Sequence, residues 1–436
     1  MPSAKDRETA ADWLADKLDA YAGEADEIPD DPAACVKWMQ TSAKRVLAAY
    51  QQYLQERREG ASRRYFRNRS HALFFLRQVA PTKLVDGAWL YGLCEGVANP
   101  RLRGLVTTYV EELGEGDPAK NHVLLYRHLL ARYGLDAQGD LDDHLYEQGL
   151  VQCALGWNAE RFLPEIVGFN LGYEQLPLHL LITAYELKEL GLDPYYFTLH
   201  VTVDNSDTGH AWRACQAAAE LAPRFGQGRD YWARVRAGAR LGNCGWGTLD
   251  VIASFDLDHE VQRILARKAV AGQGAHSHLC RIDGRLINDW LAAPAEMPAF
   301  LQALQGTGWI ERHKPAERSR FWSLLQGDRA PMWGVFSAYE LQVLRDWIEG
   351  DRPQDAGQAV KGRVRHLAGH ARSAPGKGHT AAPSTPLADL DLVAFRERIR
   401  SAKGVERQEL LIKAMSPALH WTPAGLEATR MFVNAL

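Results

Sequence analysis

Residues 196–211 read YFTLHVTVDNSDTGHA, and this stretch does most to determine the expected fold. It contains His200, Asp204 and His210 in what otherwise reads as a mostly apolar helix. Asp193-Pro194 lies just before it and predicts the start of that helix, because Asp is a favoured N-cap and Pro is favoured at the first helical position. An apolar helix that carries two imidazoles and a carboxylate needs a chemical explanation.

Two explanations fit a single histidine–aspartate pair on such a helix. His200 and Asp204 are four residues apart and therefore project from one face of the helix, which we expect to end near residue 222. An imidazole and a carboxylate buried on one face cost several kcal/mol unless something satisfies them. A metal ion or a simple hydrogen-bonded pair would do so, and the rest of the chain must distinguish the two.

The chain from about residue 31 to residue 240 has helical apolar spacing nearly throughout, with hardly any alternating segments typical of strands. The expected helices cover residues 32–57, 71–79, 81–93, 101–113, 117–133, 157–190 with an interruption at Pro177, and 193–222. The predicted fold class is all-α, with about seven helices in a compact bundle.

At 436 residues the chain is long enough for more than one domain. We expect the bundle with an N-terminal helical extension over residues 1–240 and a second, mainly helical domain of unknown role over 241–352. Residues 353–386 are rich in Gly, Ala, Ser, His and basic residues, which predicts a flexible linker. The helical tail over 387–436 ends in an apolar stretch that we expect to dock on the body.

Composition excludes several classes of function. The formal net charge of −3 gives no electrostatic reason to bind nucleic acid or an anionic membrane. The sequence shows neither a secretory signal nor an apolar run of the length that spans a bilayer, so we expect a cytoplasmic protein. The six cysteines are far apart and form no CxxC, which favours reduced, mostly buried thiols over a zinc site or a disulfide framework.

Three further residues place acid or imidazole in apolar surroundings. Glu112 shares a helical face with leucine and tyrosine, His122 begins the apolar stripe of the next helix, and Glu174 has mainly apolar neighbours at helical spacing. Each has an ordinary structural explanation when taken alone: a solvated helix end, a hydrogen-bonded core histidine, or a partner for a buried arginine. Four helices that each direct such a group inward favour a metal centre, because carboxylates and imidazoles on facing helices hold two irons in helical bundles.

The spacing of these groups differs from the ferritin-like pattern, which uses Glu-x-x-His on two helices. It resembles instead the heme-oxygenase-like diiron oxidases and oxygenases. The resemblance covers about residues 60–222 and is carried by ELGEGDPAKNH at 112–122, GYEQLP at 172–177, and YFTLH at 196–200 followed by Asp204 and His210-Ala211.

The resemblance implies a seven-helix fold, two non-heme ferrous ions and O2 as co-substrate. By motif position it implies that the iron ligands are Glu112, His122, Glu174, His200 and Asp204. Glu174, midway along the series, is the favoured bridging carboxylate.

The last ligand is either His210 or Asp207, which stands where the family commonly has histidine. On a regular α-helix Asp207 shares the face of His200 and Asp204, whereas His210 lies about 80° from His200, so His210 would need a π-bulge near Gly209. We favour His210, because His-Ala matches the residues that flank the family's final ligand.

The family's chemistry includes N-oxygenation, oxidative C–C cleavage and desaturation of substrates derived from amino acids or fatty acids, often in natural-product biosynthesis. We therefore expect an oxidoreductase that acts on a small organic substrate, with an external electron donor and a homodimer both compatible with the sequence. A metal-free oxidase of the same fold and a helical interaction or regulatory protein are the rival interpretations. Because every candidate ligand precedes residue 211, a chain shortened to residue 352 is expected to keep its iron.

Overall fold

The computed structural model of the chain describes residues 2–135, 141–203, 209–223, 228–327, 329–350 and 389–436. Among these residues the architecture is all-α apart from one two-stranded hairpin, which confirms the predicted fold class. The predicted linker over residues 353–386 lies outside the described residues.

The N-terminal region and bundle contain α1 (Ala4–Ala20), η1 (Pro32–Ala34), α2 (Cys35–Arg58), α3 (Arg69–Gln78), α4 (Ala80–Lys83), η2 (Ala88–Gly96), η3 (Pro100–Leu102), α5 (Arg103–Glu112), η4 (Gly114–Gly116), α6 (His122–Arg132), η5 (Asp143–Tyr146), α7 (Glu147–Trp157), α8 (Leu163–Tyr173), α9 (Leu178–Glu189), α10 (Tyr195–Val203), α11 (His210–Leu221), α12 (Gly228–Arg240) and η6 (Leu241–Asn243), where η marks a 3₁₀-helix. The following unit contains α13 (Thr248–Ala253), α14 (Leu257–Gly272), β1 (Arg281–Ile282), β2 (Arg285–Leu286), α15 (Ile287–Leu291), η7 (Pro294–Glu296), α16 (Met297–Gly306), η8 (Ala316–Arg318), α17 (Arg320–Leu325) and α18 (Ala338–Glu349). The tail contains α21 (Leu390–Ser401), α22 (Gly404–Ala414) and α23 (Pro423–Val433).

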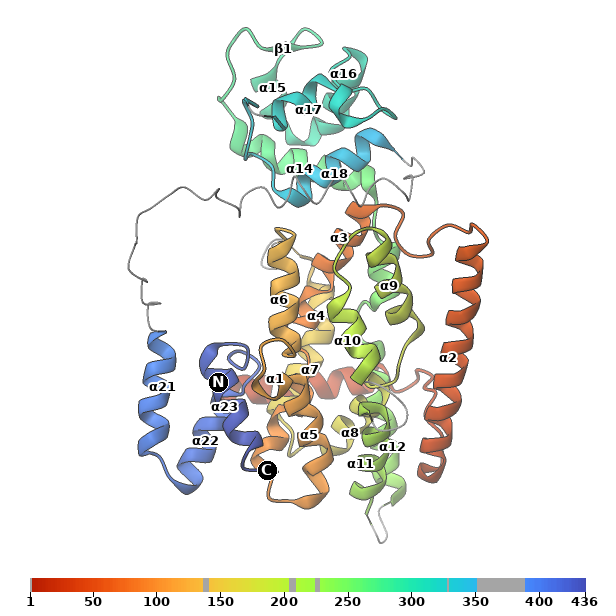
Figure 1. Ribbon diagram of the computed structural model, residues 1–436, viewed down its shortest axis with the longest axis vertical. Coiled ribbons are helices and arrows are strands. Elements are labelled where there is room, and N and C mark those ends of the chain that lie inside the picture. The colour runs from red at the N-terminus through yellow and green to blue at the C-terminus, as the bar shows by residue number, and fades with distance from the viewer. Residues whose placement is uncertain (1, 136–140, 204–208, 224–227, 328, 351–388) are drawn as a thin grey trace, which may run out of the picture.

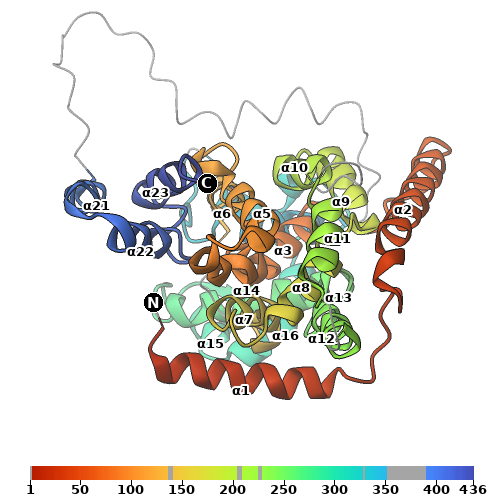
Figure 2. The ribbon, with the colours of Figure 1, turned by 90° about the horizontal axis from the view of Figure 1, so that it is seen from below.

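Figure 1 shows the bundle below a lobe that contains α14–α18, with the tail against one side of the bundle. Figure 2 shows the same arrangement from below, where α1 runs along one side of the bundle and α2 lies at its edge. No helix of the described residues is both long and apolar enough to cross a membrane. All six cysteines are free and four of them are buried, as predicted.

Several predicted helices have different bounds in the structure, and the helix expected over 81–93 is divided into α4 and the 3₁₀-helix η2. The helix expected over 193–222 is interrupted, because α10 ends at Val203 and α11 begins at His210 after an extended Gly209 (φ −80°, ψ −166°). The sequence between them, DNSDTG, consists of residues that favour turns and caps over helix interiors. Helix α6 begins at His122 instead of near Asp117, because the Asn121 side chain caps it by accepting from the Leu124 N–H.

The buried apolar side chains form two clusters. The lower core joins α5, α7, α8, α11 and α12 to α1 and to the tail, through residues such as Tyr109, Phe169, Met415 and Phe432. The upper core joins α3, α6, α9 and α10 to α13–α18, through residues such as Tyr126, Phe197, Val261 and Trp322. The tail therefore docks on the bundle as expected.

Candidate metal centre

Most of the candidate ligands lie at helix ends. Glu112 is the last residue of α5, His122 is the first residue of α6, Glu174 follows the end of α8, and His210 is the first residue of α11. His200 alone lies within a helix, α10. These ends meet where the lower and upper cores adjoin, so the polar site lies between two apolar cores.

The first group of ligating side chains is Glu112, Glu174 and His210, all at most 3% exposed. His210 Nδ1 lies 3.1 Å from Glu112 Oε1 and 3.2 Å from Glu174 Oε2. One ligand atom from each residue lies within 4.8 Å of the others, so one metal ion can reach all three. We call these residues the α11 group.

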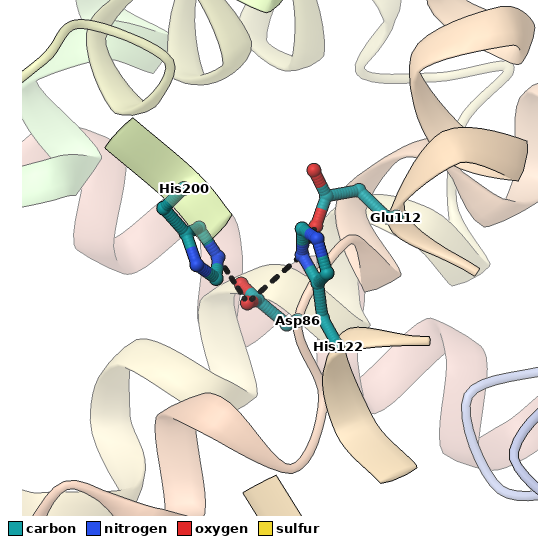
Figure 3. A group of neighbouring side chains, drawn as sticks. All are labelled: Asp86, Glu112, His122 and His200. Atoms are coloured by element: carbon teal, nitrogen blue, oxygen red, sulfur yellow. Dashed lines mark hydrogen bonds and ion pairs between the residues drawn. The ribbon is translucent and has the colours of Figure 1, made fainter. Parts of the chain in front are cut away.

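The second group consists of Asp86, Glu112, His122 and His200, and we call it the α6/α10 group. Figure 3 shows the Asp86 carboxylate between the two imidazoles, with Glu112 beside His122. Asp86 Oδ2 lies 3.2 Å from His200 Nε2 and 3.9 Å from His122 Nδ1, and Glu112 Oε2 lies 2.5 Å from His122 Nδ1. Glu112 is common to both groups, with one oxygen directed at each, whereas the sequence favoured Glu174 for the shared position.

Each group has an imidazole held from behind. His210 Nε2 lies 2.9 Å from Glu111 Oε2, and Arg213 pairs with that carboxylate, so the opposite nitrogen of His210 faces Glu112 and Glu174. His200 Nδ1 donates to the Tyr196 carbonyl at 2.8 Å, which directs Nε2 at Asp86. A carboxylate or a carbonyl behind a histidine is the arrangement that orients metal-ligating imidazoles.

The proton count of these imidazoles fits a metal centre. His200 Nδ1 must carry the proton that it donates to a carbonyl, so a neutral ring directs a lone pair at the Asp86 carboxylate. His210 has carboxylates against both ring nitrogens, and a neutral ring has a proton for only one of them. Either an extra proton or a metal ion must lie between each nitrogen and its carboxylate, and the mixed oxygen and nitrogen donors suit iron.

The charged groups of the site shift one another's pKa values. Burial would raise the pKa of Glu112, but His122 and His210 hold it well below the usual value. The pKa of Asp86 is also lowered, because Lys83 and His200 outweigh its burial and the repulsion from Glu112. Burial would lower the pKa of Lys83, but Tyr173, Asp86 and Glu112 together raise it, so its ammonium stays charged beside the carboxylates.

Asp86 reaches the site through a turn that requires glycine at the next position. Gly87 has φ +80°, and a Cβ there would lie 3.0 Å from the Glu112 Cβ, so a side chain would strain the backbone and press on Glu112. The Tyr196 hydroxyl donates to Asp86 Oδ2 at 2.7 Å and fixes the carboxylate from the other side.

The structure thus brings together five of the residues that the sequence proposed: Glu112, His122, Glu174, His200 and His210. Asp204 and Asp207 lie outside the described residues. His210 reaches the site as the first residue of a new helix, so neither a regular helix nor a π-bulge is needed.

The sequence analysis did not identify Asp86, Lys83 or Glu111 as part of the site. Asp86 could have been noticed as a single acid between two apolar runs, LV and AWL, although Asp-Gly also reads as an ordinary turn. Glu111 is in fact partly buried and paired with His210 and Arg213.

Comparison with known protein families agrees with this geometry. Residues 73–243 match the family of iron-containing redox enzymes. The matched segment runs from α3 to η6 and contains every candidate ligand named above, and it confirms the resemblance noted in the sequence. No curated protein and no solved structure matches the chain.

Proposed function

We propose that this protein is an O2-dependent non-heme diiron oxidase or oxygenase that acts on a small organic substrate. The observation that carries the proposal is Glu112, whose two carboxylate oxygens are directed at two separate groups of buried ligands. A carboxylate shared in this way is how helical bundles hold two metal ions side by side.

In this proposal Asp86, His122 and His200 would hold one iron and Glu174 and His210 the other, and Glu112 belongs to both groups. Asp204, and Asp207 as the alternative to His210, remain candidate ligands on motif position alone. The two irons would supply the binding and reduction of O2. The protein orients the imidazoles and excludes bulk water, because five of these six side chains are at most 4% exposed.

The His200 side chain is the exception at 12% exposed, which supports access for small molecules beside α10. Lys83 supports a substrate with a carboxylate. Its ammonium lies 5.8 Å and 5.9 Å from the ring centres of Tyr173 and Tyr196, and a hydrogen bond with Tyr173 helps to keep it protonated. A charged lysine beside the centre can hold a carboxylate, which amino-acid-derived and fatty-acid-derived substrates both carry.

Anaerobic loading with Fe²⁺ tests the proposal. We expect about two irons per chain and an absorbance change when O2 is admitted. Lys83→Met should keep the iron and abolish the spectral response to added amino or fatty acids. A wild-type chain that retains no iron would contradict the proposal and leave a metal-free oxidase of this fold or an interaction protein as the explanation.

A further inference from the structure

The C-terminal tail packs on the two helix ends that carry Glu112 and His122, although some three hundred positions separate them in the sequence. Helix α23 contacts η4, which connects α5 to α6, and Figures 1 and 2 show it on this side of the bundle. The Tyr109 hydroxyl, one turn before Glu112, donates to the Met415 carbonyl at 2.6 Å. Arg430 donates to the Gly116 carbonyl at 2.9 Å.

Gly116 permits this close approach. Its φ is +85°, and a Cβ at this position would collide with the Leu426 carbonyl and the Arg430 side chain. On the other side of the tail, the Arg127 guanidinium of α6 lies 3.7 Å from the centre of the Trp421 ring. The tail therefore contacts α5, η4 and α6 in turn.

Asn121 connects the two ligand-bearing helices. Its Oδ1 accepts from the Leu124 N–H at 2.9 Å and so caps α6, while its Nδ2 donates to the Leu113 carbonyl at 3.1 Å. Leu113 follows Glu112 and Asn121 precedes His122, so this one buried side chain sets the distance between the two ligands.

His420 holds Asn121 in that position. The second hydrogen of Asn121 Nδ2 points to His420 Nδ1 at 3.1 Å, and the His420 side chain is 1% exposed. Because Asn121 Oδ1 is used in the helix cap, its Nδ2 must face the imidazole, so His420 Nδ1 is an acceptor and the ring proton lies on Nε2. Burial and the Arg127 charge lower the pKa of His420 to about 3, which keeps the ring neutral.

The Nε2–H of His420 has no hydrogen-bond partner among the described residues. A buried donor without an acceptor costs stability, so an apolar or amide side chain would serve folding better at this position. The histidine contributes something other than stability, and the contact that it does make leads directly to His122.

We propose that His420 is a positioning residue of the metal centre, which acts through Asn121 to hold His122 against Glu112 and Asp86. The inference rests on the proposed diiron function and adds to it a role for the tail, which lies outside the segment that matches the family. It also changes the expectation that a chain shortened to residue 352 keeps its iron, because such a chain lacks His420.

The test uses the full chain with Co²⁺ as the probe, because Co²⁺ binds the same mixed ligands and its absorption reports each site. His420→Leu removes the acceptor at nearly constant size, whereas His420→Asn places an oxygen near the position of Nδ1 and should restore the contact. His128→Leu is the matched control, since His128 lies on α6, the helix that begins at His122, but its side chain is exposed. We expect His420→Leu to weaken one of two Co²⁺ sites about 10- to 100-fold, with the other site unchanged and His420→Asn close to wild type.

Asn121→Ser provides a second variant should His420→Leu fail to fold, because serine keeps the helix cap but cannot reach Leu113 and His420. It should weaken the same Co²⁺ site. Two unchanged sites in His420→Leu, or equal losses in His420→Leu and His420→Asn, would overturn the positioning role. A wild-type chain that binds no Co²⁺ would overturn the proposed function itself.

Discussion

The two halves of the candidate metal centre are oriented by different parts of the chain. In the α11 group, His210 is held by Glu111 and Arg213, which lie within the segment that matches the iron-containing redox enzymes. In the α6/α10 group, His122 depends on Asn121, which is in contact with His420 of the tail. The matched segment thus contains the candidate ligands of both halves and orients His210 and His200 by itself, whereas His122 is the one candidate ligand for which we propose a dependence on the tail. A family match therefore identifies the candidate ligands but not every residue that orients them.

The largest effect should come from the residue that both halves share. Glu112→Ala should abolish binding of both irons, because it removes one oxygen from each group, whereas Glu115→Ala changes only an exposed neighbour and should keep both. Iron content after anaerobic loading and desalting measures this. Retention of one full equivalent in Glu112→Ala would show that the halves do not share a carboxylate.

The second comparison separates the halves from each other. Asp86→Asn should remove the ion of the α6/α10 group and Glu174→Gln that of the α11 group, since each acid belongs to one group only. Each variant is therefore expected to bind about one iron per chain. Loss of both ions from Asp86→Asn, with the fold intact by circular dichroism, would mean that the two sites fill only together.

A smaller effect is expected from the residue behind His210. Glu111→Gln removes the charge that orients this imidazole without removing a ligand, so the affinity of the α11 group for Co²⁺ should fall by about 10- to 100-fold. The α6/α10 group should keep its affinity. This variant mirrors His420→Leu, and together the two should weaken opposite sites. Weakening of the same site by both would contradict the division of the centre proposed above.

The smallest effect concerns the stability of the metal-free protein in acid. In the folded protein the pKa of His420 is lowered to about 3, below the ordinary value of 6.5. Between pH 6.5 and pH 3, therefore, this histidine is protonated in the unfolded chain and neutral in the folded one, which favours unfolding. Its contribution to stability is complete above pH 6.5 and is lost as the pH falls toward 3, by at most about 1.4 kcal/mol per pH unit.

Urea unfolding at pH 7 and pH 5 measures this loss. Full-length wild type should lose more stability between these values than His420→Asn, which has no imidazole at this position. His71, with a pKa lowered to about 4 by burial, should preserve part of the acid sensitivity in the variant. Equal losses in wild type and His420→Asn would show that the tail histidine is not buried in solution.

Much of the fold and part of the site could be predicted because they depend on local sequence. Helical spacing, the Pro177 interruption and the Asp193-Pro194 start indicated the positions of most helices, since periodicity and capping act over a few residues. The acids and imidazoles in apolar surroundings, together with the resemblance to the diiron family, indicated five of the candidate ligands that the structure brings together. The continuous helix over 193–222 was predicted wrongly because apolar spacing on both sides outweighed the turn-forming DNSDTG between them.

The sequence by itself determined the all-α class, the chemical types of the ligands and their resemblance to a diiron family. Only the tertiary structure decided that Glu112 is shared, that Asp86 and Lys83 join the site, and that His420 reaches Asn121 from the far end of the chain. Helix formation is governed by neighbours within one or two turns, whereas these contacts depend on how whole helices pack. Residues far apart in the sequence meet at the candidate metal centre, because the two apolar cores on either side of it exclude water from the same few polar groups.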